Sequence, residues 1–380
     1  MERVDSNLIK KVEKFGKGGW NECYHCGTCT ATCALTDEGD LFPRRSYNYL
    51  QMGLKDSLTT GVEPWLCYYC GNCSEECPRE ANPAETMMIL RRYLTSVYDW
   101  TGLSGKFYTS HWWEYIAVLV IGMVTVLLLG IVNPRGIVIA LNSDGGVRIN
   151  EMFPVHWVHT GDWIMAASIG GLLVSNIIRM WYLVVYKDKS VKVPLTAYVT
   201  SVKAITESAL YFATQKRFEK CDDRKYWGAH WILMSGYVSL FTMIVLFLPW
   251  FQTEQIHAWY HPQRLLGYYG TLALFYGLFF FIIGRIKRER EVFRYSHPTD
   301  WLFVTMLFLT TLTGILLHIF RISGMPYATY YTYIIHMAVL VPMLVIEVPF
   351  SKWSHLAYRP LAKYFSELKK SAVRQGTAHG

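Results

Sequence analysis

Eight of the nine cysteines stand in two runs of identical spacing, C-x2-C-x2-C-x3-C, and a proline follows the second run. In such a run, three thiolates from one tight loop bind one [4Fe-4S] cluster, while the fourth reaches a second cluster. The spacing therefore predicts two clusters that share both runs. The expected ligand sets are Cys23, Cys26 and Cys29 with Cys77, and Cys67, Cys70 and Cys73 with Cys33.

A glycine follows the second cysteine of each run, at Gly27 and Gly71, where a residue without a Cβ atom lets the backbone bend closely around sulfide. Two zinc sites are the alternative, because C-x2-C pairs also bind zinc. Zinc needs only two pairs per site and would leave the third and fourth cysteines of each run unexplained. Cys221 stands apart in a charged loop, where we expect a free thiol without a function.

The twelve histidines are a second group of candidate ligands, because ionisable side chains within apolar segments are commonly functional. Haem iron in an electron-transfer cytochrome takes two strong axial donors from facing helices, and neutral imidazole suits this role. His336 and His355 are separated by 19 residues. This is about 28 Å along a helix, too far for one haem. The separation predicts two levels of haem b, one near each face of the bilayer.

His230 is expected at the depth of His355, and these two residues are the predicted ligands of an inner haem. His318 is expected at the depth of His336, and this pair is the predicted ligand set of an outer haem. An outer histidine also suits quinone binding or helix capping. The alternatives to His318 are His159 and His156.

These ligands need elements to hold them, and the hydropathy pattern predicts six membrane-spanning helices. The chain has 380 residues, of which 52% are hydrophobic and 17% charged, a composition typical of membrane proteins. A helix needs about 20 apolar residues to cross the hydrocarbon. The predicted spans are about 112–133, 159–186, 228–250, 265–285, 301–321 and 330–350.

The expected fold class is all-α, with a helical ferredoxin domain in residues 1–105 and a six-helix transmembrane cytochrome b bundle in residues 106–358. The loop 187–225 has apolar residues at roughly helical spacing and predicts a helix that lies along the membrane surface. Residues 359–380 are expected to form a cytoplasmic tail, a short solvated helix that frays.

The positive charges of the connections predict the orientation, since lysine and arginine are retained on the cytoplasmic side. Connections 187–225, 285–299 and 347–380 carry 20 of them, against four in the intervening connections. Both termini and the ferredoxin domain are therefore expected on the cytoplasmic side of the inner membrane. The first twenty residues contain no apolar segment of a signal peptide. The excess charge of +8 lies mainly in these connections. This distribution is typical of membrane topology and does not indicate nucleic-acid binding.

Two parts of the chain resemble known modules. Residues 15–95, with their repeated Cys-Gly step, resemble the iron–sulfur C subunit of heterodisulfide reductases. IIHMAVLVPMLVIEVPFSKWSHLAYRP resembles the last helix of the gamma subunit of respiratory nitrate reductase, whose haem-binding histidines correspond to His336 and His355. YWGAHW places His230 at that family's inner-haem position. That family's second histidine on this helix is replaced by Leu240, which leaves a single haem as the alternative.

The order of the two modules is similar to that in the C subunit of the quinone-interacting membrane-bound oxidoreductase (Qmo) complex of sulfate reducers. This resemblance implies electron transfer between menaquinol and two heterodisulfide reductase A-like flavin/iron–sulfur subunits, with adenylylsulfate reductase downstream in sulfate respiration. The alternative is a cytochrome b/ferredoxin subunit of a heterodisulfide reductase-like or other anaerobic respiratory complex. A thiol–disulfide reductase is disfavoured because two clusters would use all eight clustered cysteines. A membrane anchor without haem is the third alternative.

Overall fold

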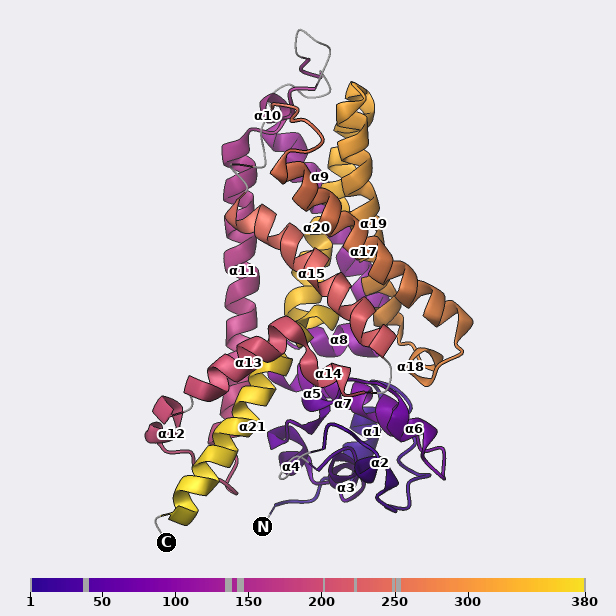
Figure 1. The fold of residues 1–380 in the computed structure, drawn as a ribbon, viewed down its shortest axis with the longest axis vertical. Helices are drawn as coiled ribbons and strands as arrows, with labels where there is room; N and C mark the ends of the chain where they lie inside the picture. The colour runs from indigo at the N-terminus through magenta and orange to yellow at the C-terminus, as the bar shows by residue number, and fades with distance from the viewer. Residues whose placement is uncertain are drawn as a thin grey trace.

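The computed structural model describes residues 2–36, 41–133, 139–141, 147–200, 202–221, 224–247, 250 and 254–378. Throughout these residues the regular structure is helical, and the only strand-like pairing described is an isolated bridge between Leu141 and Val147. A domain of short helices lies below a bundle of long ones (Figure 1). The expected all-α class with six membrane-length helices is confirmed.

The N-terminal domain is built around one long helix, α7, which is buried on nearly all sides. Its apolar residues belong in a core, its buried charged residues Glu85 and Arg92 are paired with each other, and Pro83 at its first position fits the helix start. The other helices of this domain are short and surround α7. The helices are α1 Leu8–Glu13, α2 Thr28–Ala31, α3 Arg44–Gln51, α4 Lys55–Thr60, α5 Glu63–Leu66, α6 Asn72–Glu75, α7 Pro83–Tyr98 and α8 Leu103–Thr109.

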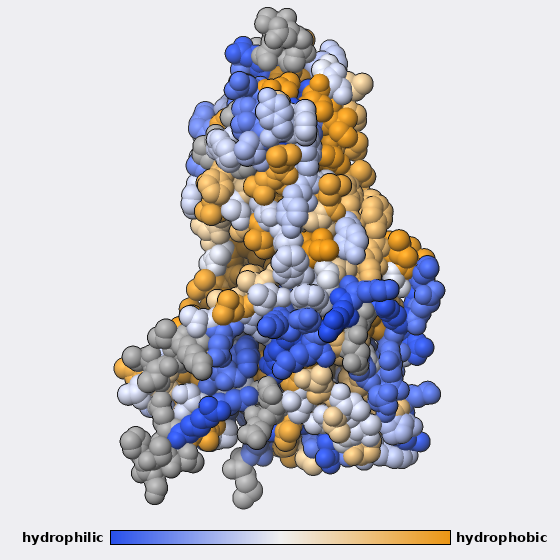
Figure 2. All heavy atoms as spheres, in the orientation of Figure 1, coloured by the Kyte–Doolittle hydropathy of each residue, from blue (hydrophilic) through white to orange (hydrophobic). Residues whose placement is uncertain are grey.

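Six helices in the described residues are long and apolar enough to cross a membrane. They are α9 His111–Val132, α11 Val155–Trp181 with its π-helical continuation η1 Tyr182–Tyr186, α15 Arg224–Leu246, α17 Pro262–Lys287, α19 Pro298–Ile322 and α20 Pro326–Phe350. Residues 248–249 of the predicted third span lie outside the described residues. Figure 2 shows apolar side chains over much of the upper part of the molecule and polar ones gathered below. Exposed apolar side chains on this scale indicate contact with lipid.

Small residues let α15 and α17 approach each other closely. A Cβ atom added to Gly236 would lie 2.7 Å from the Cβ atom of Ala273, and one added to Gly277 would lie 2.6 Å from the Cβ atom of Leu233. Such interfaces are typical of helices that pack within a membrane. α20 contacts α9, α11 and α19 and is therefore the central helix of the bundle.

Shorter elements connect the long helices. They are α10 Ile149–Met152, α12 Leu195–Thr200, α13 Val202–Thr214, α14 Lys216–Glu219, α18 Glu291–Arg294 and the 3-10 helix η2 Lys352–Ser354, followed by the long α21 His355–Ala378. α12, α13 and α14 occupy the loop for which the sequence predicts a membrane-surface helix, and α13 packs along α21 (Figure 1).

The expectation of a solvated C-terminal tail is wrong. α21 packs against α5 and α13, and Tyr358, Phe365 and Leu368 are buried. These positions form one apolar stripe at helical spacing, and the lysines between them lie on the other faces. The sequence shows the charges of this helix, which led to the prediction of a solvated tail. It does not show the surface of the protein against which the apolar stripe packs. Residues 379–380 lie outside the described residues.

The sixth span ends at Phe350, as predicted, but His355 is not on the same helix as His336, contrary to the assumption behind the separation of about 28 Å: η2 follows α20, and His355 opens α21. The Glu347 carboxylate accepts a hydrogen bond from the backbone N–H of Lys352 at 3.0 Å. A side chain that takes a backbone donor in this way competes with the helix. The chain turns at Ser351, which directs His355 toward the N-terminal domain.

Candidate functional site

The two cysteine runs fold into loops of the same shape. His25 and Tyr69, each just before the second cysteine of its run, have φ angles of 57° and 58°. Gly27 and Gly71, each just after that cysteine, have φ angles of 88° and 97°, which a residue without a Cβ atom adopts readily. Each loop leads into a short helix, and these helices, α2 and α6, are in contact. The two runs therefore turn tightly at matching points.

The second cysteine set surrounds one cavity, which is lined by Cys33, Cys67, Cys70 and Cys73. Cys67 and Cys73 are buried, whereas Cys33 and Cys70 are half-buried. Burial raises the pKa of Cys67 to about 11, and the positive charge of Arg91 opposes this effect. A buried thiolate therefore needs a cation beside it, which bound iron would supply.

The predicted first set takes Cys23, Cys26 and Cys29 from the first run and Cys77 from the second. Cys26 is exposed and the other three are half-buried, so this set lies nearer the surface than the second. Burial raises the pKa of Cys29 to about 11. The structure thus gathers Cys33, Cys67, Cys70 and Cys73 around one cavity, and the assignment of the eight cysteines to two ligand sets stays a prediction.

A single metal ion does not fit these cysteines. Within the described part of the chain, no three histidine, cysteine, aspartate or glutamate side chains come close enough to hold one ion. Four thiolates that each bind a different iron of a cubane stand farther apart than four thiolates around one zinc ion. Iron clusters rather than zinc therefore stay the prediction of the cysteine spacing.

His230 of α15 and His355 of α21 line one cavity between the bundle and the N-terminal domain. The Nδ1 atom of His230 is hydrogen-bonded to Gln215 Oε1 at 2.8 Å, and that of His355 to the carbonyl oxygen of Lys352. Metal-bound histidines usually donate their second ring N–H to such an oxygen, which leaves Nε2 for the metal. Burial also lowers the pKa of His355 well below its ordinary value, so its imidazole is neutral. This donor set fits haem iron.

The inner cavity measures about 160 Å³, which is below the range of about 300–1,000 Å³ typical of cofactor sites, and it is lined by several long cationic side chains. Cations around such a site suit the two carboxylates of a haem, and Arg92 and Lys352 among them are already paired with Glu85 and Asp300. One of them, Arg359, lies with its guanidinium 3.8 Å from the ring centre of Tyr68 and so also contacts the N-terminal domain. The cations are Arg91, Arg92, Arg285, Lys352 and Arg359.

Aromatic contacts connect the inner histidine pair with the second cysteine set. The ring centres of His230 and Phe218 are 5.9 Å apart. Phe218 in turn stacks on Tyr68 at 4.7 Å, and Tyr68 directly follows Cys67. The second cysteine set is therefore the one that lies beside the inner histidines.

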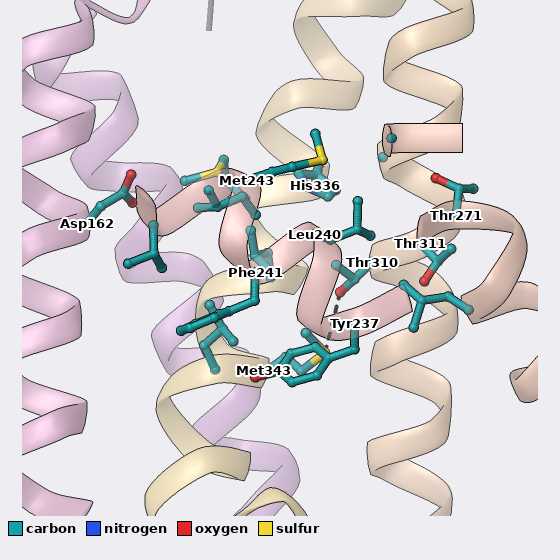
Figure 3. Close-up of a pocket in the computed structure, with 18 of the residues that line it drawn as sticks. Asp162, Tyr237, Leu240, Phe241, Met243, Thr271, Thr310, Thr311, His336 and Met343 are labelled. Atoms are coloured by element: carbon teal, nitrogen blue, oxygen red, sulfur yellow. Dashed lines mark hydrogen bonds between the residues drawn. The ribbon is translucent and has the colours of Figure 1, made fainter. Parts of the chain in front are cut away.

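His318 of α19 and His336 of α20 line a larger cavity of about 810 Å³ within the bundle. This volume lies within the range of about 300–1,000 Å³ that is typical of cofactor sites. His336 Nδ1 is hydrogen-bonded to Thr313 Oγ1 at 2.9 Å, whereas His318 uses Nε2, bonded to the Tyr268 hydroxyl at 2.9 Å. Figure 3 shows His336 beside Met243 and Leu240 at this cavity. The two outer histidines are thus brought to one cavity but present different ring nitrogens to it.

The structure distinguishes between His159 and His156, the two alternatives to His318. His159 lines the same outer cavity and accepts a hydrogen bond from Trp163 Nε1 at 3.1 Å. His156 is exposed and does not line that cavity. Asp162 and Arg321 also line it and place polar groups in an otherwise apolar space.

Sequence reasoning missed three residues of these sites. Gln215 and Thr313 hold the rings of His230 and His336, and Cys221 lines the cavity of the second cysteine set. Gln215 and Cys221 lie in the loop before α15. The local sequence of that loop does not indicate that either residue contacts a ligand residue. Thr313 lies on α19, the helix before the one that carries His336. Its contact with His336 could be predicted only if the packing of α19 against α20 were known.

Comparison with known proteins decides the nature of the N-terminal domain. A family model described as a 4Fe-4S dicluster domain matches residues 19–81. These residues form a 4Fe-4S dicluster domain. No solved structure matches the chain.

The relatives share this same part of the chain. A protein of Archaeoglobus profundus that is named as similar to the C subunit of heterodisulfide reductase is 32% identical over 102 residues, which are 26% of this chain and 54% of that protein. The C subunit of the H(2):CoB-CoM heterodisulfide,ferredoxin reductase of Methanothermobacter thermautotrophicus is 27% identical over 88 residues, 23% and 48% of the two chains. The iron-sulfur C subunit of the CoB--CoM heterodisulfide reductase of Methanopyrus kandleri is 40% identical over 69 residues, 18% and 36%. The chain spans about half the length of the curated relatives it matches, or less.

Proposed function

We propose that this chain is the membrane electron-transfer subunit of a quinone oxidoreductase complex. Two haems b in the bundle and two [4Fe-4S] clusters in the N-terminal domain supply one-electron transfer between menaquinol or menaquinone and cytoplasmic partners. The observation that carries the proposal is the aromatic contact from His230 through Phe218 to Tyr68. It joins a histidine pair suited to haem with a cysteine set suited to a cluster.

The chain's own residues hold these groups in order. Cys67, Cys70, Cys73 and Cys33 would bind the cluster beside the bundle, and Cys23, Cys26, Cys29 and Cys77 the cluster nearer the surface. His230 and His355 would bind the inner haem, with Gln215 and the Lys352 carbonyl fixing the ring orientation. His336 and His318 would bind the outer haem. In this arrangement Nε2 of His318 must leave Tyr268, or Nδ1 must serve as the ligand.

The quinone would bind at the outer end of the large cavity. A quinol loses two protons together with its two electrons, so its site needs polar groups within an apolar wall. Asp162 and His159 offer acceptors for these protons, and Arg321 offers a donor for the quinone oxygen. Figure 3 shows Asp162 at the side of the cavity that α11 provides.

The exposed first cluster site is the place where a soluble partner would receive electrons. The excess of positive charge in the connections on the side of the N-terminal domain favours a cytoplasmic location for it, with both termini on that side. The resemblance to the Qmo family supports two heterodisulfide reductase A-like flavin/iron–sulfur subunits as partners. Adenylylsulfate reductase in sulfate respiration would then be downstream.

A second candidate function has support from the relatives, which carry the names of heterodisulfide reductase subunits. In this alternative the chain is the cytochrome b/ferredoxin subunit of a heterodisulfide reductase-like complex. The partner subunits distinguish the two functions. Anaerobic purification with the native partners should yield two flavoproteins for a Qmo-like complex and a disulfide-reductase catalytic subunit for the alternative.

The test is a reduced-minus-oxidised absorption spectrum of the anaerobically purified chain and of single histidine variants. We expect a b-type spectrum with two haems per chain, and loss of one haem in each of His355→Ala and His336→Ala. His111→Ala is the control, because His111 is exposed at the start of α9, and it should retain both haems. Absence of haem from the wild-type chain would show an anchor instead, and quinol-driven haem reduction in His336→Ala with both haems retained would remove the outer site.

A further inference from the structure

Five cysteine sulfurs, and not four, surround the second cluster site. Cys221, which lies between α14 and α15, lines the same cavity as Cys33, Cys67, Cys70 and Cys73. The residue is 2% exposed and shares this small cavity with Cys70. Cys221 is distant from both runs in the sequence, where no function could be assigned to it, but the fold returns it to this cavity.

The other four cysteines supply one thiolate for each iron of a cubane cluster. Cys221 is therefore not required as a ligand and retains its S–H donor beside the sulfur of Cys70. Since the remaining four cysteines form the first set, that site has no matching thiol. The two cluster sites, otherwise related by matching loops, differ in this donor.

We infer that Cys221 donates a hydrogen bond to the Cys70 ligand of the second cluster and raises the reduction potential of that cluster. Reduction adds one electron to the cluster, and the proton of Cys221 stays on its sulfur. Hydrogen bonds to ligand sulfurs are among the factors that set cluster potentials, because they stabilise the added negative charge. Cys221 thus positions a donor and takes no part in ligation.

The donor comes from the segment that leads into the bundle, directly before the helix that carries His230. Two neighbours hold this segment on the N-terminal domain: Phe218 stacks on Tyr68, and Arg217 Nη2 donates to the carbonyl oxygen of Leu35 at 2.6 Å. The hydrogen bond that we infer to Cys70 would therefore form only when the two domains are docked. The bundle itself sets the potential of the cluster next to its inner histidines.

The inference rests on the dicluster domain and on the cysteine ligands proposed above, and it requires neither haem nor quinone. The experiment is a redox titration of the full-length chain with dithionite, followed by electron paramagnetic resonance, for wild type, Cys221→Ala and Cys221→Ser. In Cys221→Ala one cluster should move to lower potential, with its reduced-to-oxidised ratio at fixed potential falling by roughly tenfold, or about 59 mV for a one-electron couple. The other cluster is the internal control and should not move.

Cys221→Ser keeps a hydroxyl donor and should shift the same cluster by less than Cys221→Ala does, with unchanged iron content in both variants. Unaltered potentials in Cys221→Ala would overturn the inference. Loss of one cluster's iron would also overturn it, because Cys221 would then be a ligand, and so would equal shifts of both clusters, which would show general loosening of the domain. Missing haem or missing quinol oxidation would remove the proposed function and leave this titration unaffected.

Discussion

The guanidinium of Arg92 in the N-terminal domain lies 3.5 Å from the carboxylate of Asp300 at the start of α19 in the bundle. Arg92 also pairs with Glu85 at 3.1 Å, and Asp300 with Lys352 Nζ at 2.6 Å. The side chains of Arg92 and Asp300 are only 5% and 8% exposed. Two cations and two carboxylates therefore neutralise each other inside the interface, where the Arg92–Asp300 contact joins the two domains.

Asp300→Asn should destabilise the docked structure by about 3–5 kcal/mol, because it removes the carboxylate that pairs with Lys352 and also joins Arg92 to the bundle. The free energy of unfolding in denaturant measures this loss. Asp56→Asn is the control, since the Asp56–Lys187 pair is 2.7 Å long but its side chains are 53% and 41% exposed. We expect at most about 1 kcal/mol from that pair. Equal losses in the two variants would contradict a structural role for the buried pairing.

Gln215→Leu should weaken retention of the inner haem roughly 10- to 100-fold, since it removes the acceptor that orients the His230 ring. Haem occupancy during dilution, followed by absorption, measures retention. Gln263→Leu replaces another buried glutamine, at the start of α17 and away from the inner cavity. The inner haem should be retained there as in the wild type; a similar loss in both variants would show that Gln215 acts only through packing.

Stability should fall on acidification because of His297, the N-cap of α19. Its neutral Nδ1 accepts a hydrogen bond from the backbone N–H of Thr299 at 3.3 Å. Burial, helped by the charges of Arg92 and Lys352, lowers the pKa of His297 to about 4. An unfolded histidine has a pKa of about 6.5, so this contribution is complete above that pH and is lost progressively down to pH 4.

The loss amounts to about 3 kcal/mol at most. The free energy of unfolding between pH 7 and pH 5, compared for wild type and His297→Asn, measures it. Asparagine caps a helix without titrating in this range, so the variant should show a shallower pH dependence. An identical slope in both proteins would exclude His297 as the source.

The two clusters should lose iron in a fixed order. Cys26 in the first set is exposed, whereas Cys67 and Cys73 in the second are buried, so a chelator or oxygen reaches the first site sooner. Electron paramagnetic resonance during exposure to chelator should show the first cluster's signal decaying before that of the second. Simultaneous loss would mean that the domain opens as a whole before iron leaves.

Features that depend only on neighbouring residues could be predicted from the sequence. The cysteine spacing is local within each run, and it predicted the tight turns at Gly27 and Gly71 and the meeting of Cys33 with the second run around one cavity. Long apolar stretches likewise predicted the six helices. Each of these features depends on a few neighbouring residues and on rules that hold without knowledge of the packing.

Features that depend on which surfaces meet were not readable. Cys221 reaches the second cysteine set only because α14 packs against the N-terminal domain, and Gln215 reaches His230 across a turn before α15. The apolar stripe of α21 is visible in the sequence, but its burial requires α5 and α13 as partners. His318 was placed by depth alone, and depth does not determine which ring nitrogen Tyr268 engages.

The packing of α21 on α5 has a consequence for biogenesis. A ribosome completes residues 19–81 early, whereas α21 follows all six membrane helices. Trp65 of α5 receives its contacts from Tyr358 and Arg359 only after those helices have been translated. Iron can therefore be delivered to the nascent N-terminal domain well before α21 packs against it. A nonsense mutation late in the coding sequence would remove these contacts and so destabilise the domain that is encoded first.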